Sequence, residues 1–195
     1  AVSFGGGASP YAGTDRIGYV QIMTTGNAID FGDLSVIRGY NAGFSSGTRA
    51  FAAGGSGTDS IDMITMAVKG NALDFGTLTT SSRNRPSGLG NLTRGIVIGG
   101  TSSLTSMDAF TTSSGGNAVD YGNLIETREQ AAAGCTHTRG VIAGGSTSGS
   151  PSGTNSMEFI SMQSFGSAQD FGDLATTTGS FLNCCSDSHG GLGGY

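Results

Sequence analysis

The sequence predicts an all-β protein built from four tandem units, each of which contributes four short strands. Two observations lead to this prediction. A nine-residue phrase recurs four times at a nearly constant spacing, and short apolar runs alternate with glycine, asparagine and serine. Helical periodicity is absent, and each of the 36 glycines would cost about 1 kcal/mol inside a helix. We therefore expect one repeat domain that spans residues 1–195.

The recurring phrase has the pattern Gly-Asn-Ala-x-Asp-Phe-Gly-x-Leu, with Tyr in place of Phe in the third copy and Ser in place of Asn in the fourth. Its copies start at Gly26, Gly70, Gly116 and Gly166, so successive copies are 44, 46 and 50 residues apart. This period divides the chain into units of approximately 1–35, 36–79, 80–125 and 126–175, with a partial unit at 176–195.

Two further features keep the same phase as the phrase. A diglycine closes a short apolar run in three units, at Gly54-Gly55, Gly99-Gly100 and Gly144-Gly145. In each of these three units a Thr-Arg pair precedes the run, and the arginines of the three pairs are Arg49, Arg94 and Arg139. Together with an alternating apolar segment after the diglycine, these features predict four strands per unit, because each apolar run is short and bounded by turn-forming residues.

The repeated residues have predicted structural roles. The diglycines allow strands to approach one another closely near a central axis and tolerate positive φ angles. The phrase aspartates accept hydrogen bonds from nearby backbone N–H groups where an outer strand enters a tight turn, and the following aromatic ring packs between units. These aspartates are Asp30, Asp74, Asp120 and Asp170.

Arg49, Arg94 and Arg139 are expected to bond carbonyl groups, or an aspartate of a neighbouring unit, and so to link the units. The alternative is a ring of positive charge that takes an anionic ligand. A second set, Arg38, Arg83 and Arg128, follows the phrase leucines and leaves the same two alternatives open.

A diglycine that closes the second strand of a 45–50-residue, four-stranded unit resembles the Kelch repeat. The chain departs from the Kelch pattern because it contains no Trp. The Gly-Asn-Ala-x-Asp-Phe-Gly-Asp-Leu wording also resembles divergent repeat proteins of tailed bacteriophages, especially those of marine cyanobacteria. The resemblance implies a small β-propeller of about four four-stranded blades, either complete or completed by another chain, and a structural or binding role in a virion.

Composition and motifs argue against several other functions. A net charge of −5 does not suit a nucleic-acid surface, and no apolar run approaches the roughly 18 residues of a membrane helix. Asp30-x-x-Asp33 supplies too few oxygen ligands for calcium, and Cys135-x-His137 has no second pair at a zinc-site spacing. The three cysteines imply no disulfide framework. We expect no catalysis, no cofactor and no metal.

Partner contacts are expected in the two longest loops, residues 80–91 and 146–155, because loops carry function on repeat scaffolds. The candidate contact residues are Arg83, Arg85, Ser148 and Ser150; the alternative is that both loops are solvated spacers.

The leading hypothesis is a non-catalytic virion or tail-associated module, located in the virion, that contacts other virion proteins or a host-surface glycan as a homo-oligomer or part of a larger assembly. The alternatives are a carbohydrate-binding propeller lectin and an enzyme on a propeller scaffold.

The two ends of the chain are unequal. The sequence contains five diglycine strands but only four of each other kind, since both residues 3–7 and residues 189–194 resemble one. Residues 181–194 could complete the unit that the N-terminal segment opens. Three alternatives remain: a closed four-unit ring with a strand to spare, a section of a longer array, or chains joined head to tail through their exposed strand edges.

Overall fold

A computed structural model describes residues 1–8, 12–101, 104–147, 153–178 and 182–185 of the chain. These residues form four antiparallel sheets of four strands each and contain no helix, so the predicted all-β class is confirmed. No helix that could span a membrane lies in this part of the chain.

The strands are short and follow one another closely in the sequence. They are β1 (Val2–Phe4), β2 (Gly7–Ala8), β3 (Ala12–Tyr19), β4 (Ile29–Arg38), β5 (Ala42–Ser45), β6 (Arg49–Ala53), β7 (Ser60–Thr65), β8 (Leu73–Thr77), β9 (Ser87–Gly90), β10 (Arg94–Ile98), β11 (Ser106–Thr111), β12 (Val119–Asn123), β13 (Ala132–Cys135), β14 (Arg139–Ala143), β15 (Thr154–Ser161) and β16 (Gln169–Thr178).

Three of the sheets are simple meanders in which consecutive strands pair. The second sheet is β5-β6-β7-β8, the third β9-β10-β11-β12 and the fourth β13-β14-β15-β16. The first sheet differs, because β3 pairs with β4 on one side and with both β1 and β2 on the other. Among the described residues, the first sheet therefore has no strand in the position of β5, β9 and β13.

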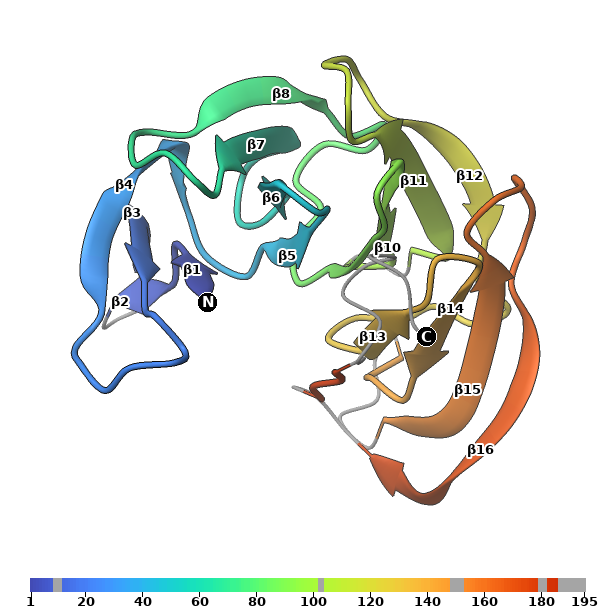
Figure 1. The fold of residues 1–195 in the computed structure, drawn as a ribbon. Coiled ribbons are helices and arrows are strands. Elements are labelled where there is room, and N and C mark those ends of the chain that lie inside the picture. Colours follow the sequence, from blue (N-terminus) through green and yellow to red (C-terminus); the bar gives the residue numbers. More distant parts are fainter. Residues whose placement is uncertain (9–11, 102–103, 148–152, 179–181, 186–195) are drawn as a thin grey trace.

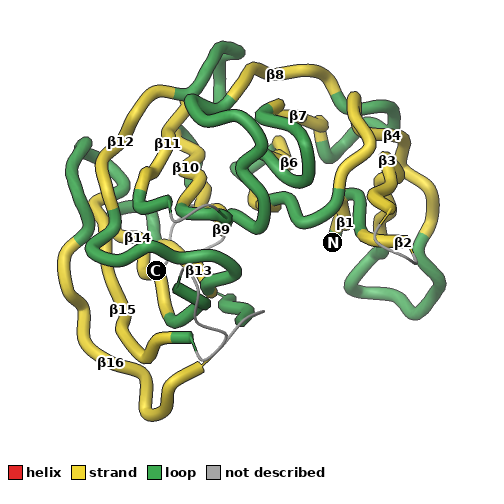
Figure 2. Tube along the Cα trace, turned by 180° about the vertical axis from the view of Figure 1, so that it is seen from behind, coloured by secondary structure: helices red, strands yellow, loops and turns green. Residues whose placement is uncertain are grey.

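The sheets follow one another around an arc in chain order (Figures 1 and 2). The first strands of neighbouring sheets lie side by side on the inner side of the arc, where β5 contacts β9 and β9 contacts β13. The last strands, β4, β8, β12 and β16, lie along the outer rim. Both views show that the described strands of the first and the fourth sheet lie apart from each other.

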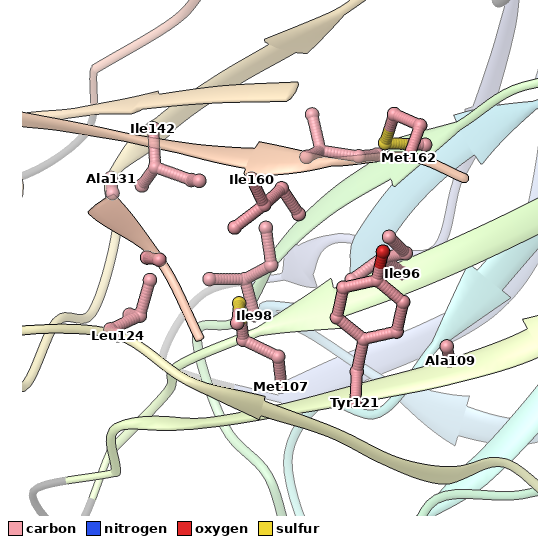
Figure 3. Packing of buried hydrophobic residues seen from close by; sticks show 12 residues of the cluster. Ile96, Ile98, Met107, Ala109, Tyr121, Leu124, Ala131, Ile142, Ile160 and Met162 are labelled. Carbon is pink, nitrogen blue, oxygen red and sulfur yellow. The ribbon is translucent and has the colours of Figure 1, made fainter. Parts of the chain in front are cut away.

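The hydrophobic core lies between consecutive sheets, because their alternating apolar side chains face one another. One cluster joins the third and fourth sheets: Ile96 and Met107 meet Ile142 and Ile160, and all four are at most 1% exposed (Figure 3). A second cluster holds four phenylalanine rings between the second and third sheets, at Phe44, Phe51, Phe75 and Phe110. Burial of these large side chains supplies the main driving force for stacking the sheets.

The Asp-Phe-Gly segment is a β-bulge inside the outer strand, so the predicted tight turn is wrong. The register of β8 against β7 shifts at this segment, and Gly76 has a φ of +153° while the strand continues to Thr77. The Asp74 carboxylate accepts the N–H of Gly76 at 3.2 Å, and Asp120 does the same for Gly122 at 3.1 Å. The predicted tight turn and the observed β-bulge both require a positive φ, but the bulge bends the strand without reversing it.

The diglycine also adopts positive φ angles, as expected for the close approach of another segment. Gly54 and Gly55 have φ angles of +64° and +109°. The N–H of Gly55 donates to the Arg83 carbonyl at 2.8 Å, and a Cβ at Gly54 would lie 2.8 Å from the same oxygen. The diglycine of one sheet therefore receives the linker that leads into the next sheet.

Candidate functional site: inter-sheet junctions and surface cavities

A buried arginine follows the repeated phrase in each of the first three sheets and pairs with a buried acid of the following sheet. Arg38 ends β4, and Arg83 and Arg128 lie in the linkers after β8 and β12; we call the three the linker arginines. The acids lie on β7, β11 and β15, the third strands of their sheets. The pairs are Arg38–Asp62 at 3.0 Å, Arg83–Asp108 at 3.0 Å and Arg128–Glu158 at 2.7 Å. All six side chains are at most 2% exposed.

The acid of each pair also holds the preceding sheet. Asp108 accepts the backbone N–H of Thr79 at 2.7 Å, just after the phrase leucine of the second sheet. Asp62 accepts the N–H of Ser35 at 2.7 Å, and Glu158 accepts that of Ile125 at 2.8 Å. Each carboxylate thus joins a linker arginine to the backbone in or just after the outer strand of the preceding sheet.

The terminal nitrogens of these guanidinium groups bind acceptors inside the protein. Arg83 donates to the carbonyls of Val97 at 3.1 Å and Ser106 at 3.2 Å, besides its pair with Asp108. Desolvation lowers the pKa of Arg83 from its ordinary value, and the charge of Asp108 opposes that shift. A charge this buried and neutralised cannot meet a ligand at the surface.

Two interpretations of this arginine set are therefore wrong. A ring of positive charge cannot be formed by Arg38, Arg83 and Arg128, because their guanidinium groups are buried and paired. Arg83 also cannot be a contact residue of the loop at 80–91, because it is 0% exposed.

The two halves of the repeated phrase bind to two different neighbours. At the junction of the second and third sheets, the Gly116 N–H donates to the Phe75 carbonyl and the Ala118 N–H donates to the Thr77 carbonyl, both at 2.8 Å. In return, the Thr77 N–H donates to Oδ1 of Asn117 at 3.2 Å. The Gly-Asn-Ala half of one copy therefore docks on the Phe-Gly-x half of the preceding copy.

The same three hydrogen bonds recur at the other two junctions. Between the first and second sheets they are Gly70 N to Phe31 O, 2.9 Å, Ala72 N to Asp33 O, 2.8 Å, and Asp33 N to Asn71 Oδ1, 3.1 Å. Between the third and fourth sheets they are Gly166 N to Tyr121 O, 3.0 Å, Ala168 N to Asn123 O, 2.8 Å, and Asn123 N to Ser167 Oγ, 3.3 Å. Ser167 thus replaces the asparagine of the phrase without loss of the acceptor.

Arginines of the Thr-Arg pairs reach across two of these junctions. Arg49 donates to the Thr112 carbonyl at 2.7 Å, and Arg94 donates to the Met162 carbonyl at 2.9 Å. Arg139, at the equivalent place on the fourth sheet, instead lies 4.6 Å from the centre of the Phe159 ring in its own sheet.

Tyr121 is the aromatic residue of the third phrase and is 2% exposed. Its hydroxyl contacts the carbonyl groups of Ser161 and Ser164 in the fourth sheet (the ring is visible in Figure 3). Burial raises the pKa of Tyr121 above its ordinary value, although the neighbouring Arg94 opposes the shift. The phenol therefore serves as a neutral link between the two sheets.

Arg85 lies at the inner side of the arc and remains partly exposed. Its guanidinium is 3.7 Å from the Glu129 carboxylate and stacks 5.2 Å from the centre of the Tyr40 ring. Its backbone accepts the N–H of Gln130 and donates to the Tyr40 carbonyl. Arg85 thus keeps an accessible charged side chain, whereas the candidate residues Ser148 and Ser150 lie outside the described residues.

Two cavities lie beside the junctions of the arc. The first, about 840 Å³, lies between β1 and β5, next to the position where the first sheet lacks a strand, and Phe4, Phe44 and Lys69 are part of its lining. The second, about 390 Å³, is lined by Arg85 and by Cys184 of the segment at 182–185, among others. Both combine apolar surface with a cationic side chain.

The cysteines and histidines form no chemical centre among the residues that the structure describes. No disulfide joins Cys135, Cys184 and Cys185 in the described part of the chain, and burial raises the pKa of Cys135. In the same residues no group of three or more His, Cys, Asp or Glu side chains could hold a metal ion.

The buried acids Asp62, Asp108 and Glu158 are the residues that the sequence interpretation missed. A signal for them exists: each is the only charged residue inside an apolar strand, at the same phase of the repeat. Charged residues are almost never fully buried without a partner, so a recurring acid at such a place predicts a recurring cation, here supplied by the linker arginines.

No protein-family model matches this chain, and no curated protein is significantly similar to it. A function for the chain has to follow from its own junctions and surfaces.

Proposed function

We propose that this chain is a non-catalytic structural and binding module whose sheets are the blades of a Kelch-like β-propeller. We further propose that it acts in the virion of a tailed bacteriophage, as a tail-associated or other structural protein. The observation that carries the proposal is the use of the recurring charged residues: three arginine–acid pairs are buried between sheets, where they bind the protein to itself.

The arrangement of the sheets supports the propeller. Three sheets are four-stranded meanders, the sheets follow chain order around an arc, and their first strands lie together on its inner side. Radial repetition of four-stranded meanders is the architecture that defines a propeller blade.

The accessible groups support binding to partners. Arg85 and the second cavity lie beside the inner strands, and the first cavity lies between the first and second sheets. The strand β1 has an edge to which no inner strand is added among the described residues. Exposed strand edges recruit further strands, and partly exposed arginines are common contact residues at protein interfaces. Other virion proteins and a host-surface glycan are the proposed partners.

A lectin is the second candidate function, and one cavity favours it. Arg94, Asn117 and Phe165 line a space of about 200 Å³ that combines an aromatic face with polar groups. The aromatic residue does not recur, however, because Thr25, Lys69 and Gly115 stand in its place in the other phrases. A propeller lectin would be expected to repeat such a pocket between its blades.

A glycan array combined with native mass measurement tests the proposal. We expect the chain to form assemblies larger than one copy, or to bind another structural protein, without tight binding to sugars. Tight sugar binding by a single copy would instead establish the lectin and contradict the structural role.

A further inference from the structure

The chain carries two uncovered halves of the inter-sheet junction, one at each end of the arc. The first Gly-Asn-Ala, on the first sheet, has an exposed Ala28, whereas Ala118 and Ala168 are buried at 7% and 9%. The last Asp-Phe-Gly, on the fourth sheet, has Phe171 at 47% exposure. The equivalent rings of Phe31, Phe75 and Tyr121 are 6%, 7% and 2% exposed.

The phrase glycines show the same asymmetry. A Cβ at Gly122 would lie 2.6 Å from the Gly166 carbonyl group, and Gly32 and Gly76 are obstructed in the same way by the next phrase. A Cβ at Gly172 would have nothing described within 4 Å. Gly172 thus keeps the conformation that a junction needs, with a φ of +129°, but contacts no following phrase among the described residues.

A matched loss of polar groups relates these two ends to each other. At the place of the buried acids Asp62, Asp108 and Glu158, the first sheet has Gly18, which pairs with Asp30 as Asp62 pairs with Asp74. The linker arginines stand four or five residues after the phrase leucine, and the sequence has Thr178 and Gly179 at these two places after Leu174.

If the fourth sheet meets a first sheet, the buried acid and the linker arginine are expected to be lost together. Removing one member of a buried ion pair leaves an uncompensated charge, whereas removing both is tolerated. A fourth sheet whose linker lacks the arginine therefore fits a following sheet that lacks the acid. Among the four sheets, only the first meets this condition.

The geometry of the arc favours a second copy over closure within one chain. The three junctions repeat the same hydrogen bonds, and after three repetitions the first and fourth sheets remain apart (Figures 1 and 2). A fourth junction of this kind needs a first sheet that continues the arc, and another copy of the chain provides one. Contacts of this head-to-tail kind are heterologous.

We propose that the fourth sheet of one copy binds the first sheet of a second copy through the same junction. The Gly26 and Ala28 N–H groups then donate to the carbonyls of Phe171 and Asp173, and Asn27 accepts the Asp173 N–H. The inference rests on the proposed assembly role, which it deepens by naming the partner.

Two substitutions test the proposal, because each blocks one half of the junction at an exposed site. Ala28→Glu places a charge on the first sheet, and Phe171→Glu places one on the fourth. Each is expected to raise the dissociation constant for self-association at least about tenfold, measured by light scattering of the full chain over a range of concentrations. Urea unfolding checks that both variants keep their folded structure.

Ile29→Glu is the matched control. Ile29 is adjacent to Ala28, but its equivalents Leu73 and Val119 remain 64% and 52% exposed beside formed junctions. This variant is expected to associate as the wild type does.

Mixing the two blocked variants gives the decisive result. Ala28→Glu retains an intact fourth sheet and Phe171→Glu an intact first sheet, so an equimolar mixture is expected to form a two-copy species that neither variant forms alone. A single-copy wild type at all concentrations, or a mixture that stays single-copy, would overturn the head-to-tail junction.

Two other outcomes separate the inference from the proposed function. Assemblies that persist unchanged in both variants would overturn this junction while leaving the assembly role standing. A single-copy protein that binds sugars tightly on the glycan array would overturn both.

Discussion

At the scale of single residues, the buried arginine–acid pairs define how successive sheets are joined. Each pair removes two charges from water, which is tolerable only because the carboxylate also accepts a backbone N–H and the guanidinium also donates to carbonyls. The pairs therefore fix which linker meets which strand. Removing one member of a pair is expected to cost more stability than removing both members.

Arg83→Leu is expected to lower the free energy of unfolding by about 3–5 kcal/mol, because it leaves Asp108 buried without its partner. The double variant Arg83→Leu/Asp108→Leu is expected to recover a large part of that loss. Urea unfolding measures both, with the exposed Arg16→Leu as control. Equal losses in Arg83→Leu and Arg16→Leu would contradict the buried pair.

Tyr121 is expected to make the protein sensitive to alkaline pH. Its pKa is raised in the folded state, so above about pH 10 the unfolded chain loses this proton while the folded chain retains it. The unfolded state then binds fewer protons, and stability falls as the pH rises. Tyr121→Phe is expected to flatten this part of the stability profile between about pH 9 and 11. The control is Tyr40→Phe, at an exposed tyrosine. If Tyr121→Phe left the slope of stability against pH as unchanged as this control does, Tyr121 would not be the source of the alkaline sensitivity.

At the scale of elements, one phrase serves two junctions. Its Gly-Asn-Ala half binds the preceding sheet, and its Phe-Gly half binds the following one, as Gly116 and Tyr121 show in the third copy. This double use explains why the whole phrase recurs as a unit. It also explains why the aromatic residue is buried in three copies and exposed in the last.

The bulge glycines allow the cost of backbone strain to be separated from the cost of a steric collision at the junction. Gly122 and Gly172 have φ angles of +139° and +129°, so alanine is strained at either position. Only at Gly122 would the new Cβ also collide with the next phrase. Gly122→Ala is therefore expected to cost about 1–3 kcal/mol more than Gly172→Ala in urea unfolding of dilute protein. Equal costs would mean that the junction does not depend on this close approach.

The elements could be predicted from the sequence where a local pattern decides them. Short apolar runs between glycines predicted four strands per unit, which the second, third and fourth sheets have. The Asp-Phe-Gly bulge was mistaken for a turn because the sequence reveals the need for a positive φ but not whether the chain reverses. The missing strand of the first sheet depends on which segment pairs with β1, and pairing between distant segments is not encoded locally.

The candidate site was less predictable than the strands. Arg83 was expected at the surface because it lies in one of the two longest predicted loops, residues 80–91. Its burial depends on Asp108, 25 residues further along the chain, whose position opposite the linker follows only from the stacking of two sheets. Function-bearing contacts here are tertiary, whereas the sequence pattern reports secondary structure.

At the scale of the whole molecule, three equivalent junctions join four sheets into an open arc with two different ends. The first sheet presents an uncovered Gly-Asn-Ala, and the fourth an uncovered Asp-Phe-Gly. Ends of this kind are complementary but not identical, so association through them proceeds in one direction and produces a ring or a filament according to the angle at each junction.

Site-resolved amide hydrogen exchange tests most directly whether the repeated phrase forms these junctions. The amides of Gly70, Gly116 and Gly166 donate across junctions, whereas no such bond from Gly26 occurs among the described residues. In dilute protein we predict slow exchange at the first three and fast exchange at Gly26, because hydrogen bonding between sheets blocks exchange until the junction opens. Equal exchange rates at all four glycines would contradict the junctions and the account built on them.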